Sequence, residues 1–293
     1  ATGRRACAAR AGSGAAEELP VPMLRAQYAE ECARHPHVRE LAAGALTRGL
    51  AFSIDDEAVS VGSGRGVRTW PHGDAPPSAS VAWNDVSDVP LIMVTGSNGK
   101  TTTTRLVAAM WRAMGATTGW SCSDGVFVES DIEKRTLGVG DYTGPGGARL
   151  VMRDADVQVG VLETARGGML RRGLGTTTAQ VAVITNISAD HFGEYGVHTL
   201  EDLAEVKAIV TRALGPESRL VLNADDPLCL AMREHVRSRR VCLYSSNSAN
   251  PALIAHQNTG GCAVTLNHTD SKSTITLSEG AHKLGTMDAR DIP

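Results

Sequence analysis

Four short apolar runs between residues 91 and 223 restrict the fold of the chain more than any other feature. Each run is rich in aliphatic residues and flanked by glycines or polar turns, and helical stretches separate the runs. This alternation is typical of buried parallel strands joined by helices. The sequence therefore predicts an α/β fold with a mostly parallel, doubly wound sheet flanked by helices. The runs are LIMVT (91–95), VQVGVLE (157–163), VAVITN (181–186) and RLVLN (219–223).

The regions outside these runs have a different character. Residues 1–20 are rich in Ala, Arg and Gly, and we expect a flexible tail there, with a transit-peptide remnant as the alternative. Helical patterns at 23–34 and 38–49, followed by alternating residues and glycine turns, predict a small α+β module at 21–80 that ends in a Pro-rich linker. After residue 250, ALIAHQ, GCAVTLN, STITLS and HKLG predict antiparallel or edge strands.

The composition disfavours several classes of function. The formal net charge of −3 over 293 residues provides no broad basic field for nucleic acid or anionic lipid. No apolar stretch approaches the roughly 18 residues of a membrane helix. The six cysteines lack C-x-x-C spacing, so we expect reduced thiols and a cytoplasmic protein, or an organellar one if the tail is a transit remnant. Small-molecule chemistry is the expected function, without nucleic acid or membrane partners and with a homo-oligomer left open.

The segment VTGSNGKTTTT (94–104) follows the first apolar run and leads into a helical stretch. Backbone N–H groups of a glycine-rich turn that opens a helix form a concave site for phosphate oxygens. Lys100 would reach the terminal phosphates, and the hydroxyl of Thr101 would ligate Mg²⁺. Val94 stands where the usual motif has its first glycine, so a plain strand-to-helix turn is the alternative. We expect a P-loop that binds a nucleoside triphosphate.

Two polar residues follow the next two apolar runs. Glu163 directly follows VQVGVL and closes the second run, and His191 comes shortly after the third. The carboxyl ends of parallel strands share one edge of a sheet, where ligands bind. A carboxylate there can bind Mg²⁺, although Glu163 could also be a solvated loop residue. His191 could contact metal or phosphate, or it could be structural.

A lysine on an apolar helix face is the next candidate. The segment HTLEDLAEVKAIVTRAL (198–214) begins with the capping-box pair Thr199 and Asp202 and continues with helical periodicity. Lys207 lies one helical step from Leu203, in the apolar stripe. Burial there is costly unless the ammonium is paired, reaches the rim or loses its charge. A neutral amine could react with CO₂ to form a carbamate. The alternative is a lysine whose stem lines the edge of the core.

The turn NADDP (223–227) follows the fourth apolar run. Such a turn can start a helix through an Asx cap and nothing more. Alternatively, Asn223 could read an adenine edge and Asp225 or Asp226 a ribose hydroxyl. The turn itself leaves both interpretations open.

In this order, TGSNGKTTTT, LETARGG, TNISADH, EVKAIV and LNADDP resemble the central ATPase domain of the Mur ligase family. The stretches SDGVFVE (123–129), GDYTGPGGAR (140–149) and VLETARGGMLRRGLG (161–175) are most similar to the Mur-like module of the cyanophycin synthetases. The resemblance covers about residues 89–245. It implies a central ATP-binding domain at 89–293 that stops before the family's C-terminal domain.

The resemblance implies roles for the matching residues. Those for ATP binding are Gly96, Ser97, Asn98, Gly99, Lys100, Thr101, Thr102, Asn223 and Asp226. The implied catalytic residues are Lys100, Glu163, His191 and Lys207. The implied metal ligands are Thr101, Glu163, His191 and, as a carbamate, Lys207. Weaker candidates for holding the carboxylate substrate are Thr143, Arg149 and Arg166.

The chemistry implied by the resemblance is ATP-dependent amide formation. A small-molecule carboxylate would attack the γ-phosphorus to give an acyl phosphate, and an amino-acid-like amine would then displace phosphate. ATP and Mg²⁺ are the cofactors that this reaction requires. Two other functions use the same loop: a P-loop NTPase or kinase-like nucleotide switch, and a non-catalytic ATP-binding fragment.

Overall fold

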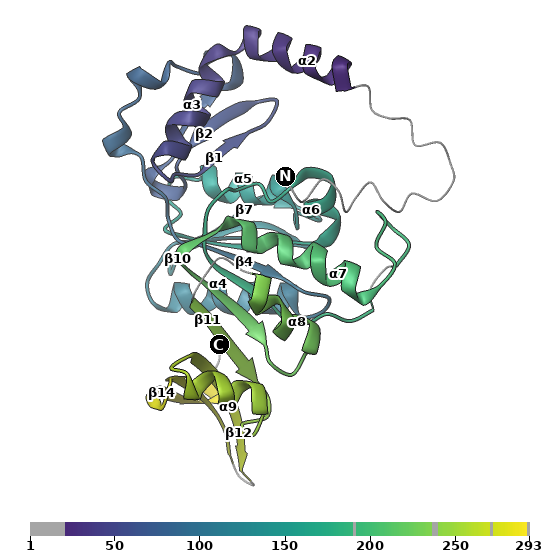
Figure 1. Ribbon diagram of the computed structural model, residues 1–293. Coiled ribbons are helices and arrows are strands. Elements are labelled where there is room, and N and C mark those ends of the chain that lie inside the picture. The colour runs from purple at the N-terminus through teal and green to yellow at the C-terminus, as the bar shows by residue number, and fades with distance from the viewer. Residues whose placement is uncertain (1–20, 190–191, 236–239, 270–271, 292–293) are drawn as a thin grey trace.

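The computed structural model describes residues 21–189, 192–235, 240–269 and 272–291. The N-terminal helices and a small sheet lie at one end of the molecule, a large sheet with its helices forms the middle, and the C-terminal strands lie at the other end (Figure 1). Among the described residues, we find no helix that is both long and apolar enough to cross a membrane.

A large twisted sheet forms the body of the described chain. Its strands are β4 (Leu91–Thr95), β5 (Thr118–Cys122), β6 (Gly125–Glu129), β7 (Lys134–Val139), β8 (Val159–Glu163), β9 (Ala179–Ile184), β10 (Leu214–Asn223), β11 (Arg240–Ser245), β12 (Cys262–Thr269), β13 (Lys272–Glu279) and β14 (His282–Asp288). The spatial order across these described strands is β14-β13-β12-β11-β10-β9-β4-β8-β5-β6-β7. In this spatial order, the seven strands β12-β11-β10-β9-β4-β8-β5 run parallel to their neighbours. Antiparallel pairs extend the sheet at both edges, with β13 and β14 beyond β12 and with β6 and β7 beyond β5. The predicted fold class is confirmed.

Helices cover both faces of this sheet (Figure 1). They are α4 (Lys100–Ala113), α5 (Pro145–Arg153), α6 (Arg166–Arg172), α7 (Leu200–Lys207), α8 (Pro227–Ala231) and α9 (Pro251–Asn258), with 3₁₀ turns η5 (Ala208–Ala213), η6 (Met232–His235) and η7 (Ala289–Asp291). Strand β4 is buried on both faces. Leu91 and Met93 pack into one core cluster, whereas Ile92 and Val94 pack with Ala108 of α4 in another. Alternating side chains thus place the end of β4 deep inside the molecule.

The N-terminal elements build a separate small core. They are α2 (Val21–Arg34), α3 (Pro36–Thr47), β1 (Phe52–Ile54), β2 (Ala58–Val61), β3 (Arg68–Pro71) and the 3₁₀ turns η1 (Gly64–Gly66), η2 (His72–Asp74), η3 (Ser78–Ser80) and η4 (Trp83–Asp85). Leu41 of α3 packs against Val59 and Val61 of the antiparallel sheet. Arg153 of α5 holds this sheet to the larger one, because its guanidinium lies 2.6 Å from Asp55 and donates to the Ala58 carbonyl at 2.8 Å. The domain bounds 21–80 and 89–293 stay predictions.

The strand predicted at ALIAHQ is wrong, because these residues belong to helix α9. The side chain of Asn250 accepts hydrogen bonds from the backbone N–H groups of Ala252 (2.9 Å) and Leu253 (3.2 Å). Pro251 occupies the first turn, where its missing N–H costs nothing. This Asn-Pro start outweighs the β-strand preference of a short apolar run. GCAVTLN, STITLS and HKLG do form β12, β13 and β14, although β12 also pairs in parallel with β11.

Candidate active site

Residues 96–99, which we call the phosphate loop, join β4 to α4. Gly96 has a φ of 146°, and a Cβ there would lie 1.8 Å from Thr185 Oγ1, so the position admits only glycine. Gly99 has a φ of 79° and opens the helix in the left-handed region. The first helical bond runs from Thr103 N–H to the Gly99 carbonyl at 2.9 Å. The N–H groups of the preceding turn therefore have no acceptor within the helix, and such a helix start attracts anions.

The chain after β9 holds the phosphate loop from one side. The carbonyl of Asn186 accepts from Ser97 N–H at 2.9 Å, and its side-chain oxygen accepts from Asn98 N–H at 3.0 Å. Thr185 Oγ1 donates to the Asn98 carbonyl at 2.6 Å, and Ser97 Oγ donates to the Ser188 carbonyl at 2.9 Å. We call Thr185, Asn186 and Ser188 the β9 wall. These bonds fix the path of the loop and leave the helix-side N–H groups as the donors for a ligand.

Lys100 begins α4, and its ammonium turns back over the loop. Its Nζ donates to the Ser97 carbonyl at 2.8 Å. The side chain therefore lies on the loop that the sequence predicts to hold phosphates. A lysine placed there can reach the terminal phosphates of a nucleotide.

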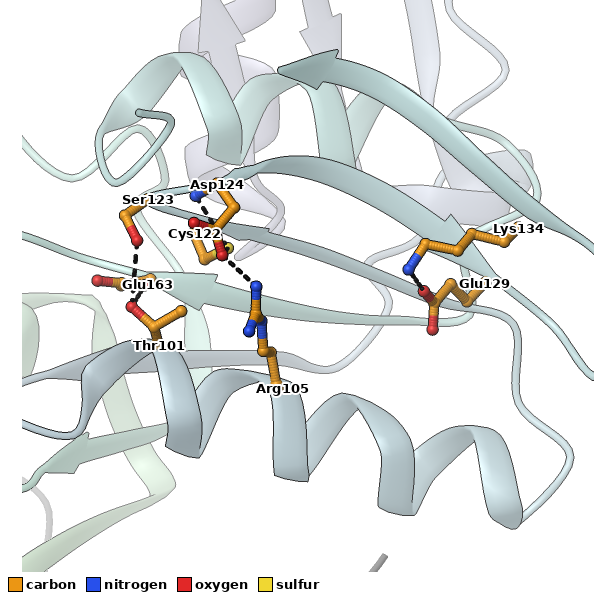
Figure 2. Close-up of polar contacts among 8 residues, drawn as sticks. All are labelled: Thr101, Arg105, Cys122, Ser123, Asp124, Glu129, Lys134 and Glu163. Carbon is orange, nitrogen blue, oxygen red and sulfur yellow. Dashed lines mark hydrogen bonds and ion pairs between the residues drawn. The ribbon is translucent and has the colours of Figure 1, made fainter. Parts of the chain in front are cut away.

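Glu163, the last residue of β8, lies against the start of α4. Its side chain is only 3% exposed and accepts a hydrogen bond from Thr101 Oγ1 at 2.8 Å (Figure 2). Burial raises the pKa of Glu163, although the Thr101 hydrogen bond, the charge of Lys100 and the Ser123 N–H act in the opposite direction. The charge of Asp141 adds to the increase. A buried carboxylate beside a hydroxyl is a suitable pair of ligands for a hard cation.

The turn between β5 and β6 forms the other side of this site, and we call Cys122, Ser123 and Asp124 the β5–β6 turn. Ser123 Oγ lies 3.3 Å from Thr101 Oγ1. Asp124 forms an ion pair with Arg105, one helical turn beyond Thr101 on α4 (Figure 2). The turn thus contacts the helix through side chains.

Lys207 is the last residue of α7 and is 1% exposed. Its Nζ donates to the Gly96 carbonyl at 2.8 Å, so the amine reaches the phosphate loop from the core side. The capping box predicted at the start of this helix is present, since Thr199 and Asp202 bond each other's backbone N–H groups. The structure therefore brings Lys100, Thr101, Glu163 and Lys207 to one edge of the sheet. His191 lies outside the described residues.

The weaker substrate candidates lie in different surroundings. Thr143 is buried, its hydroxyl donates to Asp141 at 2.7 Å, and its carbonyl accepts from Ala165 N–H two residues after Glu163. The guanidinium of Arg166 lies 2.8 Å from Glu194. Arg149 points toward the N-terminal sheet instead, where its Nε lies 3.1 Å from Asp55. Thr143 and Arg166 are thus near Glu163 in the fold, whereas Arg149 contacts the N-terminal sheet.

Asn223 and Asp226 join the ends of β9 and β10. The side chain of Asn223 donates to the Thr185 carbonyl at 3.0 Å. Asp226 accepts from Ile187 N–H at 2.6 Å and also caps α8 by accepting from Leu228 N–H. These bonds agree with the capping interpretation of NADDP and also support the β9 wall. Nucleotide contact by either residue stays a prediction.

A magnesium ion can be tested against these side chains. Hydroxyl and carboxylate oxygens are hard donors, and Mg²⁺ commonly takes one or two from protein and the rest from phosphates and water. Thr101 and Glu163 fit this pattern, because their oxygens lie 2.8 Å apart beside the phosphate loop. Within the described ranges, no group of three His, Cys, Asp or Glu side chains could hold a metal by itself.

Sequence reasoning missed the β9 wall and the β5–β6 turn. Thr185, Asn186 and Ser188 lie in the same stretch as His191, for which the sequence suggested a role. The signal was present, since small polar residues directly after a buried strand commonly bond to neighbouring backbone. Ser123 gave no such signal, because its contact depends on the pairing of β5 with β8.

Comparison with known proteins supplies the family. Residues 94–284 match the model of the Mur ligase middle domain. Cyanophycin synthetase from Synechocystis sp. is 40% identical over 208 residues, which cover 71% of this chain and 23% of that protein. UDP-N-acetylmuramoylalanine--D-glutamate ligase from Symbiobacterium thermophilum is 32% identical over 161 residues, covering 55% of this chain and 30% of that protein.

Among solved structures, MurF from Acinetobacter baumannii aligns with a TM-score of 0.45 and 16% identity, covering 68% of this chain and 38% of that one. The chain spans about a quarter of the length of the cyanophycin synthetases that it matches. The middle-domain match nevertheless extends over most of the sequence, from the end of β4 to β14. The chain belongs to the Mur ligase family.

Proposed function

We propose that this chain is the ATP-binding part of an ATP-dependent carboxylate–amine ligase similar to cyanophycin synthetase. The observation that carries the proposal is the convergence of two buried ionisable side chains on one phosphate loop. Glu163 contacts the first turn of α4 through Thr101, and Lys207 contacts the Gly96 carbonyl. Burying both ionisable groups lowers the stability of the fold. A role in binding a ligand at this loop would explain why they are buried there.

ATP would bind with its phosphates at the start of α4. The N–H groups of the first helical turn would donate to phosphate oxygens, and Lys100 would move from the Ser97 carbonyl to the β- and γ-phosphates. Asn223 and Asp226 are the proposed contacts to adenine and ribose. Mg²⁺, when bound, offsets charge on the transferring phosphoryl group, and its proposed ligands are Thr101, Glu163, His191 and carbamylated Lys207.

The proposed reaction has two steps. A carboxylate oxygen of the substrate attacks the γ-phosphorus, ADP leaves, and an acyl phosphate forms. The amine nitrogen then attacks the acyl carbon, phosphate leaves, and the nitrogen loses a proton to give the amide. Lys100 would stabilise charge on the phosphoryl group in the first step. Thr143 and Arg166 are the proposed residues that hold the carboxylate, and the hydrogen bond from Ala165 N–H to the Thr143 carbonyl, next to the end of β8, supports this role.

Lys207 carries a further chemical step in this proposal. Its ammonium would first lose one proton, and the neutral amine would then attack the carbon of CO₂ and release a second proton, so that a carbamate anion replaces a buried cation. The carbamate nitrogen keeps one N–H group, so it can still donate to the Gly96 carbonyl, which now lies 2.8 Å from Nζ. Its two oxygens would be additional hard ligands at the loop.

The test of the proposed function is ADP release in the presence of ATP, Mg²⁺, candidate carboxylates and candidate amines. A ligase sustains ADP release only when both substrates are present, because the first step alone gives a single turnover, and hydroxylamine traps the acyl phosphate as a hydroxamate. Lys100→Ala should reduce ADP release by about 100-fold or more. Lys134→Ala is the matched control, because Lys134 pairs with Glu129 away from the loop.

The other outcomes separate the alternatives. Nucleotide hydrolysis or phosphotransfer that needs no amine would indicate the NTPase or kinase-like switch. ATP binding without turnover, whichever carboxylate and amine are supplied, would indicate a non-catalytic ATP-binding fragment. Carbamylation has its own assay: ¹³C-labelled CO₂ should give a carbamate signal in the NMR spectrum that Lys207→Met removes and Lys134→Met retains.

A further inference from the structure

Two cysteines face each other on neighbouring strands far from the phosphate loop. Cys242 of β11 and Cys262 of β12 are direct partners in the parallel register. Their sulfur atoms lie 3.2 Å apart and share a hydrogen bond. Adjacent strands are about 4.8 Å apart, within the range of Cα separations that a disulfide spans. No large backbone movement is therefore needed to join the two sulfurs.

The surroundings of the two thiols differ. The guanidinium of Arg219 donates to Cys262 Sγ at 3.3 Å. Cys262 also lines an open hollow of about 540 Å³, together with Arg219, His256 and Glu279. Both cysteines are buried, with Cys262 6% and Cys242 4% exposed, but only Cys262 is among the residues that line this hollow. A small reagent in the hollow would therefore lie nearer to Cys262, beside the positive charge of Arg219.

Electrostatics makes the same distinction between the two sulfurs. The hydrogen bond shared with Cys242 and the charge of Arg219 lower the pKa of Cys262, against the opposing effects of burial and of the Glu279 charge. Sharing that hydrogen bond, together with burial, raises the pKa of Cys242. The thiolate is the nucleophilic form of cysteine. Cys262 would therefore attack an oxidant first, and Cys242 would then attack the oxidised sulfur of Cys262.

We propose that Cys242 and Cys262 form a dithiol site that a hydroperoxide oxidises to a disulfide. The Cys262 thiolate attacks one peroxide oxygen, the O–O bond breaks, and the departing oxygen takes a proton to leave as water or an alcohol. Cys262 is then a sulfenic acid. The Cys242 thiol attacks that sulfur, the S–O bond breaks, and water leaves with the thiol proton. In total, two thiols are oxidised by two electrons and the peroxide is reduced by two.

The disulfide would have a structural consequence. It would tie β12, and with it the antiparallel strands β13 and β14, to β11 of the parallel sheet. Strand β11 also reaches the β9 wall, since the Tyr244 hydroxyl donates to the Thr185 carbonyl at 2.6 Å. A covalent link across this chain segment restricts the unfolded state, so oxidation should raise the melting temperature.

Other cysteines provide internal controls. Cys229 is buried as a single thiol, and burial, with the nearby Asp226 charge, raises its pKa to about 12. Cys32 is only partly buried, on α2. Neither has the geometry of the β11–β12 pair, so neither should give a specific product with stoichiometric peroxide.

The experiment treats the full chain with hydrogen peroxide, blocks remaining thiols with an alkylating reagent and maps the peptides by mass spectrometry. We expect one disulfide, between Cys242 and Cys262, that dithiothreitol reverses and that raises the melting temperature. Cys32→Ala should not change this result. Peroxide that leaves the pair as thiols, or that links either cysteine to another residue in preference, would overturn the proposal.

Variants test the order of attack. In Cys242→Ala, Cys262 should stop as a sulfenic acid that dimedone labels, whereas in Cys262→Ala the Cys242 thiol should stay unlabelled. Arg219→Gln should slow disulfide formation about threefold or more without changing the product. Labelling of Cys242 in Cys262→Ala, or an unchanged rate in Arg219→Gln, would contradict the assignment of Cys262 as the attacking thiol. If a variant fails to fold, the disulfide mapped by mass spectrometry in the wild-type chain still tests the proposal.

Discussion

On the β9 side of the phosphate loop, Asn186 and Thr185 bond to the loop's own backbone, with distances of 2.6–3.1 Å. On the β5–β6 side, Ser123 meets Glu163 and Thr101, and Asp124 meets Arg105, so the contacts go to side chains. The loop backbone is bonded to a backbone carbonyl and to short polar side chains, so it cannot shift without breaking several hydrogen bonds at once. Side-chain contacts can be exchanged one at a time. We therefore expect the β9 wall to hold the loop in place and the β5–β6 turn to shift more readily.

The largest effect should come from Gly96→Ala. A Cβ would lie 1.8 Å from Thr185 Oγ1, and Thr185 cannot rotate away without losing its bond to the Asn98 carbonyl. We expect a loss of about 3 kcal/mol in the free energy of unfolding, measured by chemical denaturation. Gly99→Ala is the control, because its φ is also positive but nothing lies within 4 Å of the new Cβ, so only about 1 kcal/mol of strain is expected. Equal losses would mean that the β9 wall is not rigid.

Asn186→Ala should have the next largest effect. It removes a bond to the Asn98 N–H at 3.0 Å and one to the Asn98 carbonyl at 3.1 Å. We expect a loss of about 1 kcal/mol of stability and weaker ATP binding by calorimetry. Asn247→Ala, which removes a turn bond to Ala249 N–H, serves as the matched asparagine control and should leave ATP binding unchanged. Unchanged ATP affinity in Asn186→Ala would contradict a role for the wall in shaping the loop.

Glu163→Gln should change how the free energy of unfolding depends on pH, which tests the β5–β6 side of the loop. Burial raises the pKa of Glu163 in the folded protein, so the folded state binds the proton more tightly than the unfolded state. Stability from this group is then present below the usual value of 4.5 and is lost as pH rises through the raised pKa. The glutamine variant lacks this loss. Its free energy of unfolding relative to wild type should rise between pH 4 and pH 7, by about 1.4 kcal/mol for each unit of pKa difference.

The same variant should lose ADP release at pH 7, because an amide cannot supply the proposed anionic ligand. A variant that gains stability and loses activity is expected where a charged group is buried for function at a cost in stability. Glu201→Gln, on the exposed surface of α7, separates this effect from the simple loss of a negative charge. A glutamine variant at position 163 that is destabilised more at pH 7 than at pH 4 would show that the carboxylate is structural.

The smallest effect is expected for Ser123→Ala. Its hydroxyl contact to Thr101 is long, at 3.3 Å, and the N–H that faces Glu163 remains. Stability should change by about 0.5 kcal/mol or less in thermal denaturation. Ser123→Pro, which removes the N–H, should reduce ADP release more than the alanine variant does. If Ser123→Ala were as costly as Asn186→Ala, the two sides of the loop would be equally rigid.

The elements that could be predicted from sequence are those fixed by local patterns. The strand at 91–95 has its expected bounds, and the helix that follows begins at Lys100. The capping box at Thr199 and Asp202 is also a local pattern. The strands β5, β6 and β7 were not predicted, because their residues alternate weakly and they are stabilised by pairing with β8 and with one another. The strand predicted at 252–257 failed because the cap at Asn250 decides the conformation.

The residues of the candidate site also fall into those that local sequence patterns predict and those that depend on contacts between distant segments. Lys100, Thr101 and Glu163 could be placed together, since strand ends of a parallel sheet share an edge, and Lys207 could be recognised from a charge on an apolar stripe. Their chemical roles stay predictions. Arg149 could not be placed, because its partner Asp55 is almost a hundred positions earlier in the chain. Long-range pairing of this kind leaves no local trace in a sequence.

The position of β4 in the sheet affects how the chain can fold during synthesis. Its partners are β8 and β9, and the residues that grip its loop follow at 185–188. About 65 residues must therefore be made after β4 before it can pair with β8, and about 90 before it can pair with both neighbours, which takes roughly 5 to 20 s at ordinary rates of translation. During that time the apolar segment 91–94 is exposed on the nascent chain. We expect chaperones to bind around these residues, because the strand that leads into the phosphate loop lies between two strands that are made later.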